Sequence, residues 1–243
     1  MAHGTPDYGG AGPKSTTYFL QDMAELAVRL GSPVNLDRRG EVIALIAFGS
    51  GWQGWIGTGS GVGFAGYISS KEPLHGNCHA VLKTGNVLND NYAMGSQIFY
   101  PAPGPAGVEG SFIPVANLLN FDVLAQAFTG AVTTLFGARY LHTTGKLQVN
   151  DAVAGWVEIG SPGVQFQAMS CYSYLKMVVD LTTGYYVRVI FNGQGFTPTA
   201  YQGISSATAV RKSLWTGVAV YTGAAASIEV PVGHVIVTQN EPV

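Results

Sequence analysis

Apolar and polar residues alternate along much of the chain with the two-residue period of a β-strand. The clearest case lies near the C-terminus, where residues 175–179 form an apolar run, residues 180–184 a turn, and residues 185–191 alternate. The side chains predicted to share one face of this second strand are Tyr185, Val187, Val189 and Phe191, with Tyr186, Arg188 and Ile190 on the other. Asn192-Gly193 then predicts another tight turn. The segment therefore predicts two consecutive hairpins.

The rest of the chain after residue 40 repeats this rhythm of short strands and turns. Strands are predicted at residues 34–36 and 42–46, joined by a turn at 37–40, and at residues 218–222, 227–232 and 234–239. The glycine-rich segment 49–66 predicts a loop or irregular strands held by aromatic packing. Residues 118–136 fit a short helix almost as well as a strand. The pattern indicates a single β-sandwich over residues 41–243.

The N-terminal residues follow a different pattern. Residues 1–14 are rich in Gly and Pro and predict an extended arm. Residues 15–40 predict a helix and a turn: Ser15-Thr16-Thr17 is an N-cap signal, apolar residues at helical spacing follow, and Gly31 and Pro33 end the element. We expect the helix to span residues 17–30.

Charged residues are scarce. They form 11% of the chain, against roughly 25% in an ordinary soluble domain. Nine of the 26 lie within residues 1–41. Because monomeric β-proteins use charge to protect strand edges from pairing, this lack favours a homo-oligomer whose subunits cover one another. A neutral monomer solvated by Thr, Ser, Asn and Gln is the alternative. The residues expected to mediate assembly are Tyr8, Tyr18, Phe19, Met23 and Leu26.

Composition also argues against several classes of protein. A net charge of −2 and a pI near 6.2 provide no basic surface for direct nucleic-acid binding. The longest apolar run, residues 42–48, is too short to span a membrane, and residues 1–6 lack the features of a secretory signal. Synthesis in the cytoplasm without a signal peptide is expected. Cys78 and Cys171 are too few for a disulfide framework, and two buried free thiols are favoured over one bridge.

Several segments resemble the concanavalin A-like, or laminin G-like, jelly rolls. Residues 176–180, the following turn and residues 185–193 are similar to the central hairpin of that family, residues 218–221 and 233–238 to its last strands, and residues 78–85 to an early strand. Together these cover about two thirds of the chain. The resemblance implies a mainly β fold, an antiparallel jelly-roll sandwich preceded by the extended arm and one short α-helix. The family includes glycan-binding lectins, glucan hydrolases and virion surface modules, so the fold does not choose a function.

The N-terminal segment is similar to the opening of uncharacterised proteins from tailed-phage and related virion genes, over residues 3–8, 23–31 and 37–40. With the low charge, this resemblance supports a leading hypothesis: a non-enzymatic structural protein of a virion-type assembly, such as a capsid-surface, decoration or tail-associated subunit. Its partners would be copies of itself and other virion subunits, and its location a virion or assembled particle. The alternative is a lectin-like carbohydrate-binding module with a glycan as its partner.

Sequence motifs for catalysis are weak, and no catalytic residue and no cofactor is predicted. Retaining glucanases of this superfamily need two carboxyls on one strand, whereas Glu158 and Glu229 stand alone. Two Gly-x-Gly-x-x-Gly matches, beginning at Gly49 and Gly61, open no helix that could bind a phosphate, and no Gly-x-Ser-x-Gly elbow occurs.

Sequence motifs for a metal or glycan site are also weak. His75, Cys78 and His79 lack a fourth ligand for structural zinc, so a polar turn is favoured and no metal is predicted. The tryptophans are Trp52, Trp55, Trp156 and Trp215, for which core or interface packing is favoured over sugar stacking. If a glycan site exists, Trp52 and Trp55 are the predicted residues.

Overall fold

The computed structural model describes residues 40–46, 48, 51–52, 54–71, 78–98, 102–165, 172–207 and 212–243. All regular elements in these residues are β-strands. The predicted arm at residues 1–14, the predicted helix at 17–30 and the predicted strand at 34–36 lie outside them. Within the described residues, no helix has the length and apolar character needed to cross a membrane.

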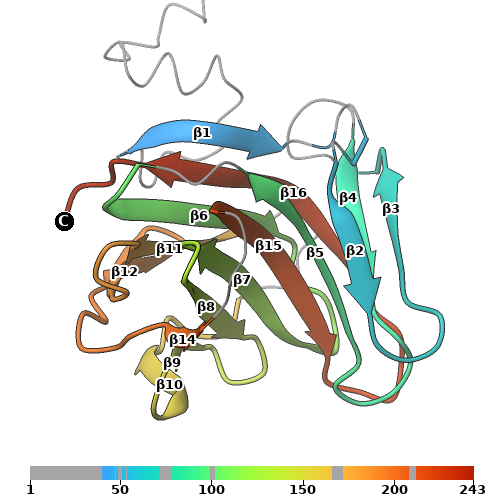
Figure 1. The fold of residues 1–243 in the computed structure, drawn as a ribbon. Helices are drawn as coiled ribbons and strands as arrows, with labels where there is room; N and C mark the ends of the chain where they lie inside the picture. The colour runs from blue at the N-terminus through green and yellow to red at the C-terminus, as the bar shows by residue number, and fades with distance from the viewer. Residues whose placement is uncertain are drawn as a thin grey trace, which may run out of the picture. The chain divides into compact units, whose positions relative to one another are not determined.

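Two antiparallel sheets form a sandwich (Figure 1). The strands of the first, sheet A, are β1 Glu41–Ile46, β3 Ala65–Ser69, β4 His79–Lys83, β6 Pro105–Phe112, β11 Ser173–Asp180, β12 Tyr186–Phe191, β13 Gln194–Phe196 and β16 Glu229–Gln239. Their order is β13-β12-β11-β6-β16-β4-β3, and β1 also pairs with β16. The antiparallel sandwich predicted from the sequence is therefore confirmed.

Sheet B has the order β10-β9-β8-β7-β15-β5-β2, and β14 also pairs with β8. Its strands are β2 Ile56–Gly59, β5 Asn91–Ile98, β7 Leu118–Phe128, β8 Val132–Leu141, β9 Lys146–Asp151, β10 Gly155–Gly160, β14 Ile204–Ala207 and β15 Ser213–Thr222. The last two long strands of the chain, β15 and β16, lie inside sheets B and A respectively. Each sheet therefore contains a C-terminal strand that lies between two strands from much earlier in the sequence. In sheet B, β15 lies between β7 and β5, and in sheet A, β16 lies between β6 and β4.

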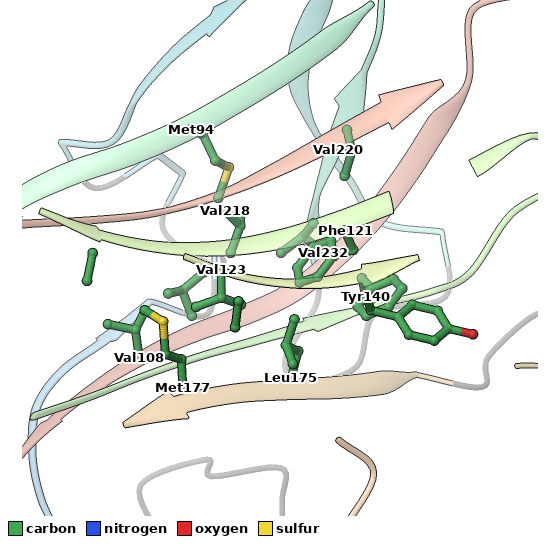
Figure 2. Packing of buried hydrophobic residues seen from close by; sticks show 14 of the residues in the cluster. Met94, Val108, Phe121, Val123, Tyr140, Leu175, Met177, Val218, Val220 and Val232 are labelled. Atoms are coloured by element: carbon green, nitrogen blue, oxygen red, sulfur yellow. The ribbon is translucent and has the colours of Figure 1, made fainter. Parts of the chain in front are cut away.

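The core lies between the sheets and is built from alternate residues of each strand. Phe112 of sheet A stacks on Phe121 of sheet B with ring centres 4.0 Å apart, and Tyr140 stacks on Phe191 at 4.3 Å. Figure 2 shows apolar side chains of both sheets meeting in the same layer. Each fully buried aromatic side chain stabilises the fold by roughly 1.5–3 kcal/mol, so these cross-sheet pairs fix how the layers pack.

Hairpin β11–β12 confirms the clearest sequence prediction and corrects one part of it. The strands and their turn lie where the pattern placed them. However, Val187 is skipped in the register, which is a β-bulge. Tyr186 therefore enters the core together with Val189 and Phe191, while Tyr185 is exposed. The prediction that Tyr185 and Val187 share the face of Val189 is wrong, because a bulge reverses strict alternation.

Strand pairing and turn geometry test four further predictions. The predicted strand at 42–46 exists as β1, and its partner in the described residues is β16. Residues 227–232 and 234–239 were predicted as separate strands but form one, β16, with a register shift between Val232 and His234. Residues 118–128 are strand β7, so the helical alternative for that segment is wrong. In the two-residue turn Asn192-Gly193, both residues have positive φ, as predicted.

The outward faces of the two sheets differ in exposure. Every residue of β12 is buried, and so are outward-facing His234 and Val178 of sheet A. In sheet B, strand β9 alternates strictly between half-buried and buried residues, and the outward residues of β7 and β8 include many half-buried ones. Over the central strands, the outer face of sheet B is therefore more exposed than that of sheet A.

Candidate functional site

The outer face of sheet B carries a group of polar and aromatic side chains, which we call the Arg139 cluster: Asn120, Asp122, Arg139, Trp156 and Tyr221. Asp122 on β7 is directly opposite Arg139 on β8. Arg139 donates from Nε to Asp122 Oδ1 at 2.9 Å and from Nη2 to Oδ2 at 2.7 Å. Asn120 Nδ2 donates to the same Oδ1 at 2.6 Å. This two-pronged contact fixes the plane of the guanidinium.

Aromatic rings lie beside the guanidinium of Arg139. Its Cζ lies 3.8 Å from the centre of the Trp156 ring and 5.3 Å from that of Tyr221. Trp156, on edge strand β10, lies close to the backbone of β8, since a β-carbon at Gly137 would lie 2.9 Å from its Cη2 atom. A residue larger than glycine at 137 would displace the indole. Trp156 thus supplies the ring, and Gly137 leaves the space that the ring occupies.

Burial sets the electrostatics of the pair. It raises the pKa of Asp122, and the Arg139 guanidinium and the Asn120 amide oppose that rise. Desolvation lowers the pKa of Arg139, but the contacts with Asp122 and Tyr221 together outweigh it, so the net shift is upward. A bidentate pair of this kind holds its geometry whether or not a ligand is bound.

A second ion pair lies on the same face, where Lys146 Nζ is 2.6 Å from Glu158 Oε2. The Lys146 contact, more than any other, lowers the pKa of Glu158. Both pairs join one cation to one anion. The face around the Arg139 cluster is thus polar but has its charges balanced, which suits an uncharged ligand.

The two tryptophans predicted from the sequence lie elsewhere. Trp55 is buried in the core, 7% exposed, with its ring edge-on to Phe48 at 6.4 Å. Trp52 packs against the same Phe48 at 6.1 Å and is half-buried. For Trp55 this is the packing role that the sequence favoured. A glycan contact by either residue stays a prediction.

Comparison with known proteins gives a fold and no family. No protein-family model matches the chain, and no curated protein matches it. Among solved structures, a carbohydrate esterase of Shiga toxin-encoding bacteriophage phi24B matches with a TM-score of 0.56 at 16% identity, over 82% of this chain and 98% of that one. A protein of unknown function with a galectin-like fold from Bacillus subtilis matches with a TM-score of 0.52 at 11% identity, over 83% and 97%.

The chain therefore shares the β-sandwich fold of these two proteins. A β-glucanase of Bacillus licheniformis is also similar, with a TM-score of 0.47 at 12% identity over 83% of this chain and 99% of that one. The first two matches, at 16% and 11% identity, agree with the antiparallel sandwich that the sequence resemblance implied. They do not transfer a site or an activity.

The residues predicted to mediate assembly are outside the described part of the chain. These are Tyr8, Tyr18, Phe19, Met23 and Leu26. Their role stays a prediction, as does that of the arm and the helix to which they belong.

Within the described residues, the candidate zinc ligands and the candidate catalytic carboxylates do not come together. No group of three His, Cys, Asp or Glu side chains there could hold a metal ion. His79 is buried and Cys78 is half-buried rather than buried, while His75 and Cys171 lie outside the described residues. Glu158 and Glu229 belong to different sheets and each pairs with a lysine.

One polar trio on the outer face of sheet A has distances reminiscent of a catalytic set. Ser111 Oγ lies 2.8 Å from His234 Nδ1, and His234 Nε2 lies 3.3 Å from Glu109 Oε1. Ser111 and His234 are fully buried, and Ser111 Oγ also accepts the backbone N–H of His234 at 3.0 Å. A nucleophile must reach its substrate, so we interpret the trio as a bridge between β6 and β16 that satisfies buried polar groups.

Sequence reasoning missed the Arg139 cluster for a specific reason. Asp122 and Arg139 are 17 positions apart, and the segment containing Asp122 was ambiguous between helix and strand. Only the β7–β8 register brings them together. The usable signal was alternation within residues 120–123, where polar Asn120 and Asp122 alternate with apolar Phe121 and Val123.

Proposed function

We propose that the chain is a non-enzymatic, lectin-like module that binds neutral glycans on the outer face of sheet B, at the Arg139 cluster. The observation that supports this most is the combination of a guanidinium held by Asp122 with the half-buried Trp156 indole on the outer face of sheet B. A sugar ring presents C–H groups on its faces and hydroxyl groups around its rim. Recognition therefore needs an aromatic surface together with rigid donors and acceptors.

The cluster supplies both kinds of group. Arginine has five N–H donors, and the two bonds to Asp122 leave others for ligand hydroxyls. Arg139 lies over one face of the half-buried Trp156 ring, and the exposed part of the indole would contact the sugar. The balanced charges of the face favour a neutral over an acidic sugar.

The test is a glycan array followed by calorimetric titration of the best neutral binder. Trp156→Ala should weaken binding roughly tenfold, because loss of an aromatic contact costs about 1.4 kcal/mol. Trp52→Ala is the matched control and should bind like the wild type, because Trp52 packs against Phe48 and the core rather than in the Arg139 cluster. Melting curves confirm that both variants are folded.

Each other outcome is informative. Loss of binding in Trp52→Ala with Trp156→Ala unaffected would move the site to the residues predicted from the sequence. Failure of the wild type to bind any neutral glycan would overturn the proposal. Release of shortened or deacylated sugars from the same ligands would contradict its non-enzymatic part.

The virion-type assembly role stays a prediction. Its five residues lie outside the described chain, and the similarity to a phage protein at 16% identity shows a shared fold alone. Self-association, virion partners and location in an assembled particle therefore also stay predictions.

A further inference from the structure

A second tryptophan lies on the same face as the Arg139 cluster. Trp215 is on β15, between Leu214 and Thr216, which face the core side, and it is half-buried. A β-carbon at Gly95 would lie 2.1 Å from Trp215 Cζ2, and one at Gly217 would lie 2.6 Å from its Cη2. The indole therefore lies against the backbone of two neighbouring strands, β5 and β15, and no side chain separates it from them.

The register gives the separation of the two tryptophans. Gly217, beneath Trp215, is opposite Leu124 of β7, and Leu124 is opposite Gly137, beneath Trp156. Gly217 and Gly137 are thus two strand spacings apart in one row, which is about 10 Å. This exceeds the width of one sugar ring. A single monosaccharide cannot contact both indoles, whereas a short chain laid across the strands can.

We infer that the ligand is a linear neutral oligosaccharide of at least about three sugars, which runs across β8, β7 and β15 from Trp156 to Trp215. The inference rests on the proposed function and adds the chain length and direction of the ligand. Leu124 lies between the two indoles and is half-buried, so it contacts the middle of the chain.

The surroundings of Trp215 favour a sugar chain over a protein partner. Gln126 is directly opposite Trp215, and Asn150 is opposite Trp156. Amide side chains donate and accept at once, as sugar hydroxyls require. The two ion pairs that the described residues form on this face, Asp122–Arg139 and Lys146–Glu158, each balance one cation with one anion. The core of a stable protein interface is instead a continuous apolar patch.

The experiment compares ligand length with tryptophan substitution. Cello-oligosaccharides and galacto-oligosaccharides of increasing length, from one to about six sugars, are titrated calorimetrically into the wild type and into Trp215→Ala. Wild-type affinity should rise roughly tenfold once the chain is long enough to span both rings. Trp215→Ala should lose this rise and keep the affinity for the shortest ligand. Trp215→Phe, which keeps a ring, should retain part of it.

The two proposals fail in different ways. If Trp156→Ala weakens binding as expected but affinity gains with length are equal in the wild type and Trp215→Ala, the chain-length inference is wrong and the proposed function stands. If the wild type binds no oligosaccharide of either series and no glycan on the array, both are wrong. Trp215→Phe keeps the test valid if Trp215→Ala does not fold.

Discussion

Removing the carboxylate of Glu241 should destabilise the sandwich by about 3 kcal/mol. The Glu241 side chain is fully buried on the outer side of sheet A. It accepts from Lys176 Nζ at 2.7 Å, from Thr238 Oγ1 at 2.5 Å and from Arg188 Nη2. A β-carbon at Gly107 would lie 2.9 Å from its Oε1 atom, so the carboxylate fills space that glycine leaves.

The magnitude follows from the two cations. Lys176 and Arg188 are 4% and 9% exposed, and breaking a buried ion pair by removing one partner costs about 3–5 kcal/mol. Both cations have other interactions, so the lower end of that range applies. With a denaturant slope of about 2–3 kcal/mol per M, Glu241→Ala should lower the urea midpoint by about 1 M. Glu241→Gln should lose nearly as much, because the amide keeps the size of the side chain but not its charge.

Glu229 provides the control. Its side chain is 49% exposed and pairs with Lys83 at 3.3 Å, so solvent screening limits the loss in Glu229→Ala to less than about 1 kcal/mol. The measurement is urea unfolding followed by tryptophan fluorescence at low and high salt. Equal midpoints for Glu241→Ala and Glu229→Ala would refute the argument. So would strong salt dependence of the Glu241 effect, since a buried pair is little screened.

Three further predictions concern single groups. Thr216→Val should raise the free energy of unfolding by about 1 kcal/mol, because the fully buried hydroxyl has no hydrogen-bond partner among the described residues; a lower urea midpoint would contradict this. Burial and the bond to Glu229 raise the pKa of Tyr67 from 10 to about 12, so its contribution to stability is complete below pH 10 and is lost as the pH rises towards 12. An ultraviolet absorbance titration should show this phenol ionising late, and earlier in Glu229→Gln. Gly95→Ala should displace Trp215 and shift its fluorescence, at a cost of about 1–3 kcal/mol, whereas Gly195→Ala, with open space around it, should do neither.

Much of the fold could be predicted because the strands of β11–β12 are local and strongly patterned. Residues 175–191 contain both strands and their turn, so no distant partner is needed to recognise them. The misjudged details each depend on pairing. The bulge at Val187 is visible only against β11, and the continuity of β16 past His234 only against β6. Residues 118–128 became unambiguous only when paired with β15 and β8.

The candidate site was harder to predict for a related reason. Trp52 and Trp55 were the predicted glycan residues because they lie among glycines. In the structure, glycine instead lets a ring pack inward: a β-carbon at Gly66 would lie 2.9 Å from Trp52 Cη2. Beneath Trp215, by contrast, Gly95 and Gly217 face outward from sheet B, so this indole packs on the outer face of the sheet. Glycine near tryptophan predicts close ring-to-backbone packing. The side of the sheet on which it occurs comes from strand register, which a single sequence does not reveal.

The low charge of the chain now has a second physical interpretation. Of the few ionic residues in the sandwich, Glu109, Asp122, Lys176, Arg188 and Glu241 are less than 10% exposed, so its outer surface is even less charged than its composition indicates. From the sequence, that lack favoured sister copies that cover strand edges. It suits a neutral glycan equally well, because binding then removes water from few ionic groups. The two interpretations differ in stoichiometry: a glycan module that functions alone keeps the mass of one chain at high concentration, whereas an assembly subunit gains mass without any sugar. Light scattering of the full chain, repeated with the oligosaccharide that binds best, therefore separates them more directly than any further argument from composition.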